Sequence, residues 1–301
     1  MVDFDIDLVV PFVDNKDPVW RQCYLDFCAL NNEFARIQEM VGARFDDFGF
    51  FEYSLKLIDK FMPWIRNIYL IVSNPEQVPD YINKEKTKIV LHKDIIPAQY
   101  LPTFNSTTIE MFIPNIEGLS EHFIYTNDDM YPVAPLTKED FFTDDGKIKM
   151  NFSGRDIRHN SKQFRLVCQR CFQHVAESLG YRHDDYTYLK PNHSMTPMIK
   201  SHCIECLEKL ASHIYPNIWA FRTEYQHNQY IYPLYEYLIN NRVEGPIRFL
   251  YTSLKHSADE ITFNITSGAY QLICLNDVSV PDRSSIQVEK IKQAFEDLLK
   301  N

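Results

Sequence analysis

Three polar residues, Asn127, Asp128 and Asp129, follow the apolar run at residues 123–125 with a single threonine between them. Two adjacent carboxylates at the end of a buried strand are costly unless water or a cation neutralises them. Hard divalent cations take such oxygen ligands, above all when phosphates complete their coordination. The triplet therefore predicts either a solvated turn or the cation site for a phosphate-bearing substrate.

A polar loop at residues 101–110 enters a predicted helix and contains the acid Glu110. Thr107 and Glu110 have the spacing of a capping box, which would give the acid a structural role. Substrate binding is the alternative. Asn105, in the same loop, offers amide donors and a carbonyl oxygen that suit a sugar or a phosphate equally well.

His193 lies three residues before Thr196 and Pro197, which predict a helix cap followed by proline at the first helical position. Beside a helix N-terminus, a histidine meets free backbone N–H groups and a positive dipole end, a setting that attracts phosphate. Arg222 could clamp a phosphate with its planar guanidinium. The structural alternatives are a packed histidine and a surface arginine.

Two cysteine pairs, Cys168 with Cys171 and Cys203 with Cys206, have the spacing of zinc ligands. Each pair also belongs to an apolar stripe of helical period, and cysteine packs as a small hydrophobe. Thiolate pairs in zinc sites usually lie in turns rather than in the middle of a helix. Core packing is therefore favoured over zinc binding.

The elements that would position these residues alternate between strands and helices. Apolar runs at residues 8–13, 68–72, 88–91 and 123–125 predict strands, and helical spacing at residues 51–62 predicts a helix between the first two. Strand, helix, strand is the order of a parallel α/β sheet. Ligands bind at the carboxyl ends of such strands, so Asp14 and the 127–129 triplet stand where a substrate would lie.

After residue 145 helical patterns dominate, at residues 164–179, 197–214 and 229–239. An apolar run at residues 271–275 precedes Asn276 and Asp277, and a final amphipathic helix is predicted at residues 285–299. We therefore expect an α/β part at residues 1–145, a helical insertion at residues 146–260, and a C-terminal strand and helix at residues 261–301. Together they are expected to form one continuous domain.

The composition excludes several classes of protein. The 301 residues carry 41 acids and 31 bases, a formal net charge of −10, which disfavours a nucleic-acid binder. Seven cysteines cannot all pair, and without a signal-like start they indicate a reduced, cytoplasmic protein, either free or at the inner face of the membrane. The apolar runs are strand-sized, so no transmembrane segment is expected.

Four blocks of this sequence resemble the Stealth family of sugar-1-phosphate transferases. The family includes bacterial capsular polysaccharide phosphotransferases and the catalytic subunit of the lysosomal-enzyme GlcNAc-1-phosphotransferase. The blocks are residues 5–18, residues 53–130 with gaps, a weaker block around His193 and Pro197, and Cys274-Leu275-Asn276-Asp277. The chain departs from the family pattern at Pro11-Phe12, at Asn15-Lys16, and near Phe50-Phe51-Glu52, where an expected arginine is missing.

The resemblance implies a glycosyltransferase-A-like, Rossmann-like α/β fold with a helical insertion. Residues 1–145 would then bind the nucleotide sugar. The acidic triplet and the fourth block would meet around a UDP-sugar and a divalent cation, Mg²⁺ or Mn²⁺. The implied reaction transfers sugar 1-phosphate to a hydroxyl of a saccharide acceptor and releases UMP, in capsular or cell-surface polysaccharide synthesis.

The resemblance also implies roles for individual residues. Asp128 and Asp129 would have metal and catalytic roles, with Asp277 as a further metal ligand. His193 would act as the acid/base and Arg222 as the charge clamp. The residues that would position donor or acceptor are Asp14, Asn105, Glu110, Asn127, Gln229 and Asn276.

Two other functions compete with this interpretation. An ordinary UDP-sugar glycosyltransferase of the same fold would use the same acids but release UDP. A non-catalytic binding module would be favoured by loss of the acids, yet Glu110, Asp128, Asp129 and Asp277 are all present.

Overall fold

The computed structural model describes residues 1–40, 45–46, 48–158, 162–182, 184, 186–276 and 285–300. The five strands of the central sheet are β1 (Ile6–Pro11), β2 (Ile68–Val72), β3 (Thr87–Leu91), β4 (His122–Tyr125) and β9 (Thr196–Ile199). Their order is β3-β2-β1-β4-β9. The first four are parallel, and β9 pairs antiparallel with β4 at the edge. This arrangement confirms the predicted Rossmann-like α/β class.

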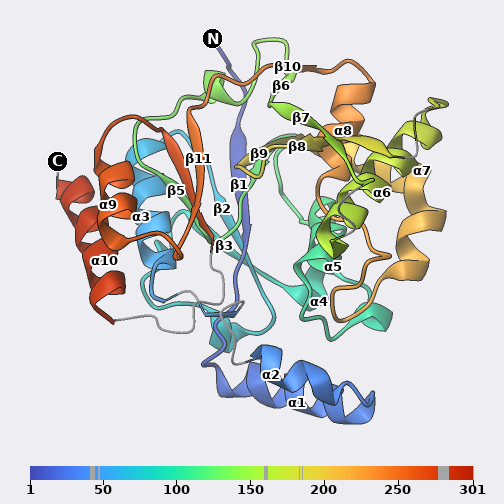
Figure 1. Cartoon of the computed structure of the whole chain (residues 1–301), viewed down its shortest axis with the longest axis horizontal. Coiled ribbons are helices and arrows are strands. Elements are labelled where there is room, and N and C mark those ends of the chain that lie inside the picture. Colours follow the sequence, from blue (N-terminus) through green and yellow to red (C-terminus); the bar gives the residue numbers. More distant parts are fainter. Residues whose placement is uncertain are drawn as a thin grey trace.

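Side chains of β1 alternate between the two faces of the sheet, as the pleat of a strand requires. Leu8 and Val10 pack with α3 (Phe51–Phe61), which has the predicted helical stripe. Val9 packs on the opposite face with three helices of the predicted insertion. These are α6 (Gln163–Ser178), α7 (Lys200–Ile214) and α8 (Ile231–Leu238). The sheet is therefore buried on both faces, with α3 on one side and α6–α8 on the other (Figure 1).

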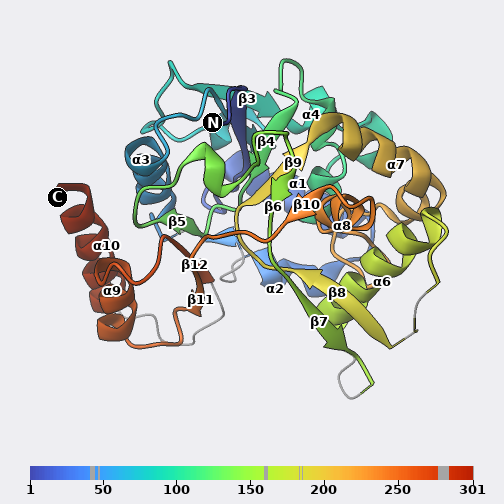
Figure 2. The same ribbon diagram turned by 90° about the horizontal axis from the view of Figure 1, so that it is seen from above.

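A second sheet contains β5 (Met130–Pro132), β11 (Phe249–Ser253) and β12 (Leu272–Asn276). β12 lies in the middle, parallel to β11 and antiparallel to β5. Two helices, α9 (Ala258–Thr266) and α10 (Ser285–Lys300), pack against it through the cluster that contains Ile273 and Phe295 (Figure 2). Because β5 begins directly after Asp129, its pairing with β12 brings the C-terminal segment to the acidic triplet.

The remaining elements surround these two sheets. Trp20 of α1 (Pro18–Leu30) packs with Phe104 and Phe221 in a smaller cluster. The other elements are α2 (Ile37–Met40), α4 (His92–Ile95), α5 (Ser106–Glu110), β6 (Ile148–Lys149), β7 (Phe152–Asp156), β8 (Thr187–Pro191) and β10 (Arg242–Val243). Within the described residues, no helix has both the length and the apolar character needed to cross a membrane.

One predicted helix start is wrong. Thr196 and Pro197 do not open a helix but lie in β9, and α7 begins only at Lys200. Pro197 is paired with Ile124 of β4. Proline is tolerated in an edge strand because the outward-facing N–H groups of such a strand have no partner strand, so the N–H that proline lacks costs no hydrogen bond of the sheet. His193 therefore does not lie beside a helix N-terminus, and the dipole argument for phosphate binding at this residue fails.

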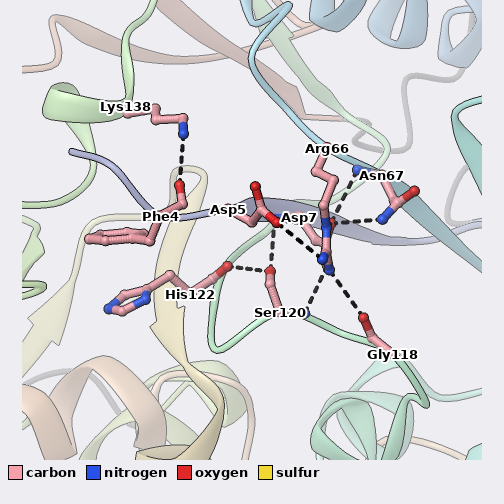
Figure 3. A network of polar contacts seen from close by, with 9 residues as sticks. All are labelled: Phe4, Asp5, Asp7, Arg66, Asn67, Gly118, Ser120, His122 and Lys138. Atoms are coloured by element: carbon pink, nitrogen blue, oxygen red, sulfur yellow. Dashed lines mark hydrogen bonds and ion pairs between the residues drawn. The ribbon is translucent and has the colours of Figure 1, made fainter.

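An ion pair between a half-buried arginine and a buried carboxylate fixes the opposite, amino-terminal end of the central strands (Figure 3). The side chain of Asp7 in β1 is fully buried and receives two hydrogen bonds from Arg66, of 2.9 and 2.6 Å. The backbone N–H groups of Asn67 and Ser120 donate to the same carboxylate at 3.1 and 2.8 Å. Burial alone would raise the pKa of Asp7, but the hydrogen bonds from Arg66 and Ser120 lower it. One carboxylate therefore ties β1 to the segments that lead into β2 and β4.

Candidate active site

A cavity of about 1150 Å³ opens at the carboxyl ends of the parallel strands. Val13, Ser73, His92 and Asn127 line it, and each follows one of the four parallel strands. Ligands of parallel α/β sheets bind at this edge. The predicted site residues that line the cavity are Asn105, Glu110, Asn127, Asp128, Asp129, His193, Arg222, Gln229 and Asn276.

One described site residue, Asp14, is not part of this lining. The carboxylate of Asp14 turns back to accept the N–H of Lys16 at 2.8 Å, and its backbone is held by Gln77. Short-range turns of this kind are a common use of aspartate. The structure therefore corrects the prediction for Asp14. Asp277 lies outside the described residues, so its predicted role as a metal ligand stays a prediction.

Asp129 carries an unsatisfied oxygen at the centre of the site. Its Oδ2 accepts a hydrogen bond from the thiol of Cys274 at 3.3 Å, and the backbone N–H of Leu275 donates to its carbonyl at 3.0 Å. Among the described residues, its Oδ1 is a buried oxygen with no hydrogen-bond partner. An orphaned carboxylate oxygen beside a second acid, Asp128, fits an oxygen-preferring cation such as Mg²⁺ or Mn²⁺.

His193 is held in the cavity from both sides. Its Nδ1 lies 3.2 Å from the hydroxyl of Tyr230, and its Nε2 lies 3.4 Å from the amide nitrogen of Asn127. Since that amide nitrogen can only donate, this arrangement places the hydrogen of the neutral ring on Nδ1 and the lone pair on Nε2. Burial lowers the pKa of His193, whereas Asp129 opposes the shift. The imidazole is therefore neutral at pH 7 and able to accept a proton.

The hydrogen-bonded chain that holds His193 ends at Glu110. The hydroxyl of Tyr125 lies 2.8 Å from Oδ1 of Asn127 and 3.1 Å from Oε1 of Glu110. The backbone N–H of Gln229 donates to the other carboxylate oxygen of Glu110 at 2.7 Å. A phenol has one hydrogen to donate, so Tyr125 serves either Glu110 or Asn127 at a given moment. The protonation of Glu110 thus bears on how Asn127 is held against His193.

The capping-box explanation for Glu110 is wrong. Asn105, not Thr107, caps α5, and Glu110 is the last residue of this short helix. The carboxyl group is buried, which raises its pKa to about 7, although the N–H of Gln229 and the charge of Arg222 oppose the shift. A buried acid that titrates near neutrality is typical of functional sites.

We predict that Glu110 makes folding pH-dependent. Its pKa is about 7 in the folded chain and near 4.5 when unfolded, so it lowers the stability as pH rises from about 4.5 to about 7. Glu110→Gln should remove this slope, on the order of 3 kcal/mol between pH 4.5 and pH 8. Urea denaturation of both proteins across this range measures the difference. Glu117→Gln, which replaces an exposed acid, is the control; parallel profiles for wild type and Glu110→Gln would contradict the prediction.

The comparison with known proteins agrees with this geometry. The conserved region described as Stealth protein CR2, conserved region 2, matches residues 44–150, which include the acidic triplet, Asn105 and Glu110. The receptor polysaccharide phosphotransferase WefC of Streptococcus oralis is 29% identical over 331 aligned positions, which span 98% of this chain and 97% of that protein. The chain belongs to the Stealth family.

Other Stealth relatives match shorter stretches at higher identity. An exopolysaccharide phosphotransferase of Lactiplantibacillus plantarum is 41% identical over 148 residues, 48% of this chain and 42% of that protein. Among solved structures, galactosyltransferase LgtC in complex with donor and acceptor sugar analogues has a TM-score of 0.41 and 10% identity, covering 98% of this chain and 95% of that chain.

Three polar residues of this Stealth site differ in how many hydrogen-bonding groups they leave for a ligand. The Asn105 side chain bonds Thr107, Trp219 and Gln226, so it holds the loop at the cavity wall. Arg222 is exposed and donates to the hydroxyl of Ser106 at 2.6 Å, which leaves further guanidinium donors toward the cavity. Among the described residues, the buried Oε1 of Gln229 has no hydrogen-bond partner.

Sequence reasoning missed several residues of this Stealth site. Cys274 was noticed only as part of the fourth block, although its thiol contacts Asp129. Tyr125 ends a predicted strand and Tyr230 lies in a predicted helix, and neither pattern marks them as site residues. Arg155 and Lys190 line the cavity from the two-stranded antiparallel sheet of β7 and β8, whose sequence has no recognisable motif.

The four helical cysteines lie in the core of the Stealth fold. Cys168, Cys171, Cys203 and Cys206 are all buried in the cluster between the sheet and helices α6–α8. Burial raises the pKa of each of these thiols. Their positions agree with the packing interpretation.

Proposed function

We propose that this chain transfers sugar 1-phosphate from a UDP-sugar to a hydroxyl of a saccharide acceptor and releases UMP, in capsular or cell-surface polysaccharide synthesis. The observation that carries the proposal is the orphaned buried oxygen of Asp129 in a cavity that also holds a neutral His193 and Arg222. Support also comes from the relatives, which are named capsular, exopolysaccharide and receptor polysaccharide phosphotransferases.

Asp128 and Asp129 are the residues that would hold Mg²⁺ or Mn²⁺, with Asp277 as a further ligand. When bound, the cation neutralises charge on the donor diphosphate. The exposed guanidinium of Arg222 would neutralise the remaining phosphoryl oxygens, since its planar donors match phosphate geometry. The unpartnered side-chain oxygen of Gln229 would accept a hydrogen bond from a hydroxyl group of the donor sugar or of the acceptor saccharide.

His193 would act as the base. Once the acceptor hydroxyl replaces the Asn127 amide at Nε2, this nitrogen takes the proton of the hydroxyl while the acceptor oxygen bonds to the β-phosphorus of the donor. The bond from that phosphorus to the oxygen bridging the two phosphates breaks, and UMP leaves with the bridging oxygen. The chain's part in such a reaction is alignment and charge stabilisation. Tyr230 keeps the imidazole in the orientation that this step needs.

We further propose that residues 1–145 bind the nucleotide sugar, residues 146–260 provide the acid/base and the charge clamp, and residues 261–301 close the site. The seven free cysteines support a reducing location, in the cytoplasm or at the inner face of the membrane.

The identity of the released nucleotide tests the proposed function. The protein is incubated with a panel of UDP-sugars and Mg²⁺ or Mn²⁺, with and without oligosaccharide acceptors. The expected result is acceptor-dependent UMP and a phosphodiester-linked product, both lost after chelation with EDTA. Release of UDP would instead establish an ordinary glycosyltransferase. Binding of a donor without turnover on any acceptor would favour a binding module.

Replacing His193 separates catalysis from packing. His193→Ala should lower kcat on the order of 100-fold or more while the affinity for the UDP-sugar changes little, because the base acts in the transition state. Turnover, donor calorimetry and melting temperature are measured together. His256→Ala, which replaces a histidine on the surface away from the cavity, is the control. Near-normal turnover of the folded His193 variant would end its role as the base.

A further inference from the structure

Three side chains of different chemistry converge at the floor of the cavity. A carboxylate oxygen of Asp129, a ring nitrogen of His193 and the sulfur of Cys274 all lie within 4.8 Å of one another. They come from the turn after β4, the loop between β8 and β9, and strand β12. The fold therefore assembles an oxygen, a nitrogen and a sulfur ligand from three separate segments.

The one measured spacing between these ligand atoms suits a small tetrahedral ion. Bond lengths of about 2.0–2.3 Å at tetrahedral Zn²⁺ place the ligand atoms roughly 3.3–3.8 Å from one another. The sulfur of Cys274 and Oδ2 of Asp129 are 3.3 Å apart. Three protein ligands with a fourth position open toward a cavity form a common arrangement at zinc. Asp129 and His193 line the cavity, and Cys274 is buried behind them.

The choice of ligands separates this site from a magnesium site. Mg²⁺ is bound through oxygen, whereas thiolate and imidazole ligands favour Zn²⁺ and similar ions. Tyr230 and Asn127 contact the two ring nitrogens of His193; a bound ion would replace one of these contacts, and the other would orient the ring. Oδ1 of Asp129 has no partner among the described residues.

We propose that Asp129, His193 and Cys274 form an inhibitory binding site for Zn²⁺. Binding replaces the thiol proton of Cys274 by a zinc–sulfur bond and releases that proton to water. It also takes the lone pair of His193 and an oxygen of Asp129. The inhibitory part rests on the proposed function, because these are the base and the cation ligand of the proposed transfer. The binding part stands independently of any activity.

Cobalt spectroscopy of the full-length protein tests the binding. The metal-free chain is titrated with Co²⁺, which replaces Zn²⁺ in such sites and shows a thiolate charge-transfer band in the near ultraviolet. One equivalent should produce the band, and Zn²⁺ should displace it. Cys274→Ser should lose the band, whereas Cys168→Ser, at a buried cysteine of α6, should keep it. Cys274→Ala replaces the serine variant if circular dichroism shows that the latter does not fold.

An inhibition assay tests the consequence. With Mg²⁺ in excess, Zn²⁺ should abolish transfer by the wild type, and Cys274→Ser should need at least about 10-fold more Zn²⁺ for half-inhibition of its own rate. Absence of the cobalt band, or its persistence in both Cys274 variants, overturns the site. A wild type that binds Co²⁺ yet transfers normally with Zn²⁺ bound overturns the inhibition. If no UDP-sugar supports transfer, the proposed function fails while the cobalt titration still decides the site.

Discussion

Replacing Asp129 by asparagine should lower the transfer rate on the order of 1000-fold. The substitution keeps the shape of the side chain but removes the charge whose Oδ1 has no partner among the described residues. In a water-poor site, single electrostatic contacts to the transition state typically contribute factors of about 100 to 1000. Release of UMP from the UDP-sugar that serves the wild type best is the measurement.

The matched control is Asp80→Asn, at an exposed acid away from the cavity, which should transfer at the wild-type rate. A melting curve of each variant shows whether loss of rate reflects unfolding. If folded Asp129→Asn retains more than about a tenth of the rate, this carboxylate does not act in the transition state, and the metal assignment would have to rest on Asp128.

Replacing Arg66 by methionine should destabilise the fold by about 3 kcal/mol at pH 7. The substitution leaves the carboxylate of Asp7 buried without its charged partner, and leaving a buried charge uncompensated in this way is costly. The pKa of Asp7 is lowered in the wild type, so its contribution is present above pH 4 and is lost as pH falls below about 3.8. The stability difference between the two proteins should therefore shrink in acid.

Urea denaturation at pH 7 and pH 3.5 measures both effects. The same arginine contacts a second acid, Asp5, at 3.3 Å, but that side chain is 67% exposed. Asp5→Asn is therefore the control and should cost less than about 1 kcal/mol. Equal effects of the two substitutions, or an Arg66 effect that does not depend on pH, would contradict the role assigned to the pair of Arg66 and Asp7.

The four parallel strands of the central sheet could be predicted because each is an apolar run that can be recognised in the sequence. Buried parallel strands are continuous apolar runs, and the run at residues 68–72 coincides with β2. The position of the cavity followed from a general rule for such sheets. The start of α7 could not be predicted in the same way, because Thr196 and Pro197 have local helix signals that pairing with β4 overrides.

The failures at the site have a common physical origin. The roles of Asp14 and Glu110 depend on which partner their carboxylates find, and several partners fit the same sequence. Asp14 found a backbone N–H two residues away, and Glu110 found Gln229 and Tyr125. The contact between Asp129 and Cys274 depends on the pairing of β5 with β12, and only β12 coincides with a predicted apolar run.

The contact between Asp129 and Cys274 joins residues 145 positions apart in the sequence. The site can therefore form only after both segments have been synthesised. A nascent chain that has emerged as far as β9 already possesses every strand of the central sheet. Domains fold as the chain leaves the ribosome, N-terminal parts first. The wall formed by β12 arrives only after helices α7, α8 and α9 have been made. A nascent chain that ends before β12 thus exposes Asp129 without its partner segment, and competence for chemistry is acquired only once β12 has been added.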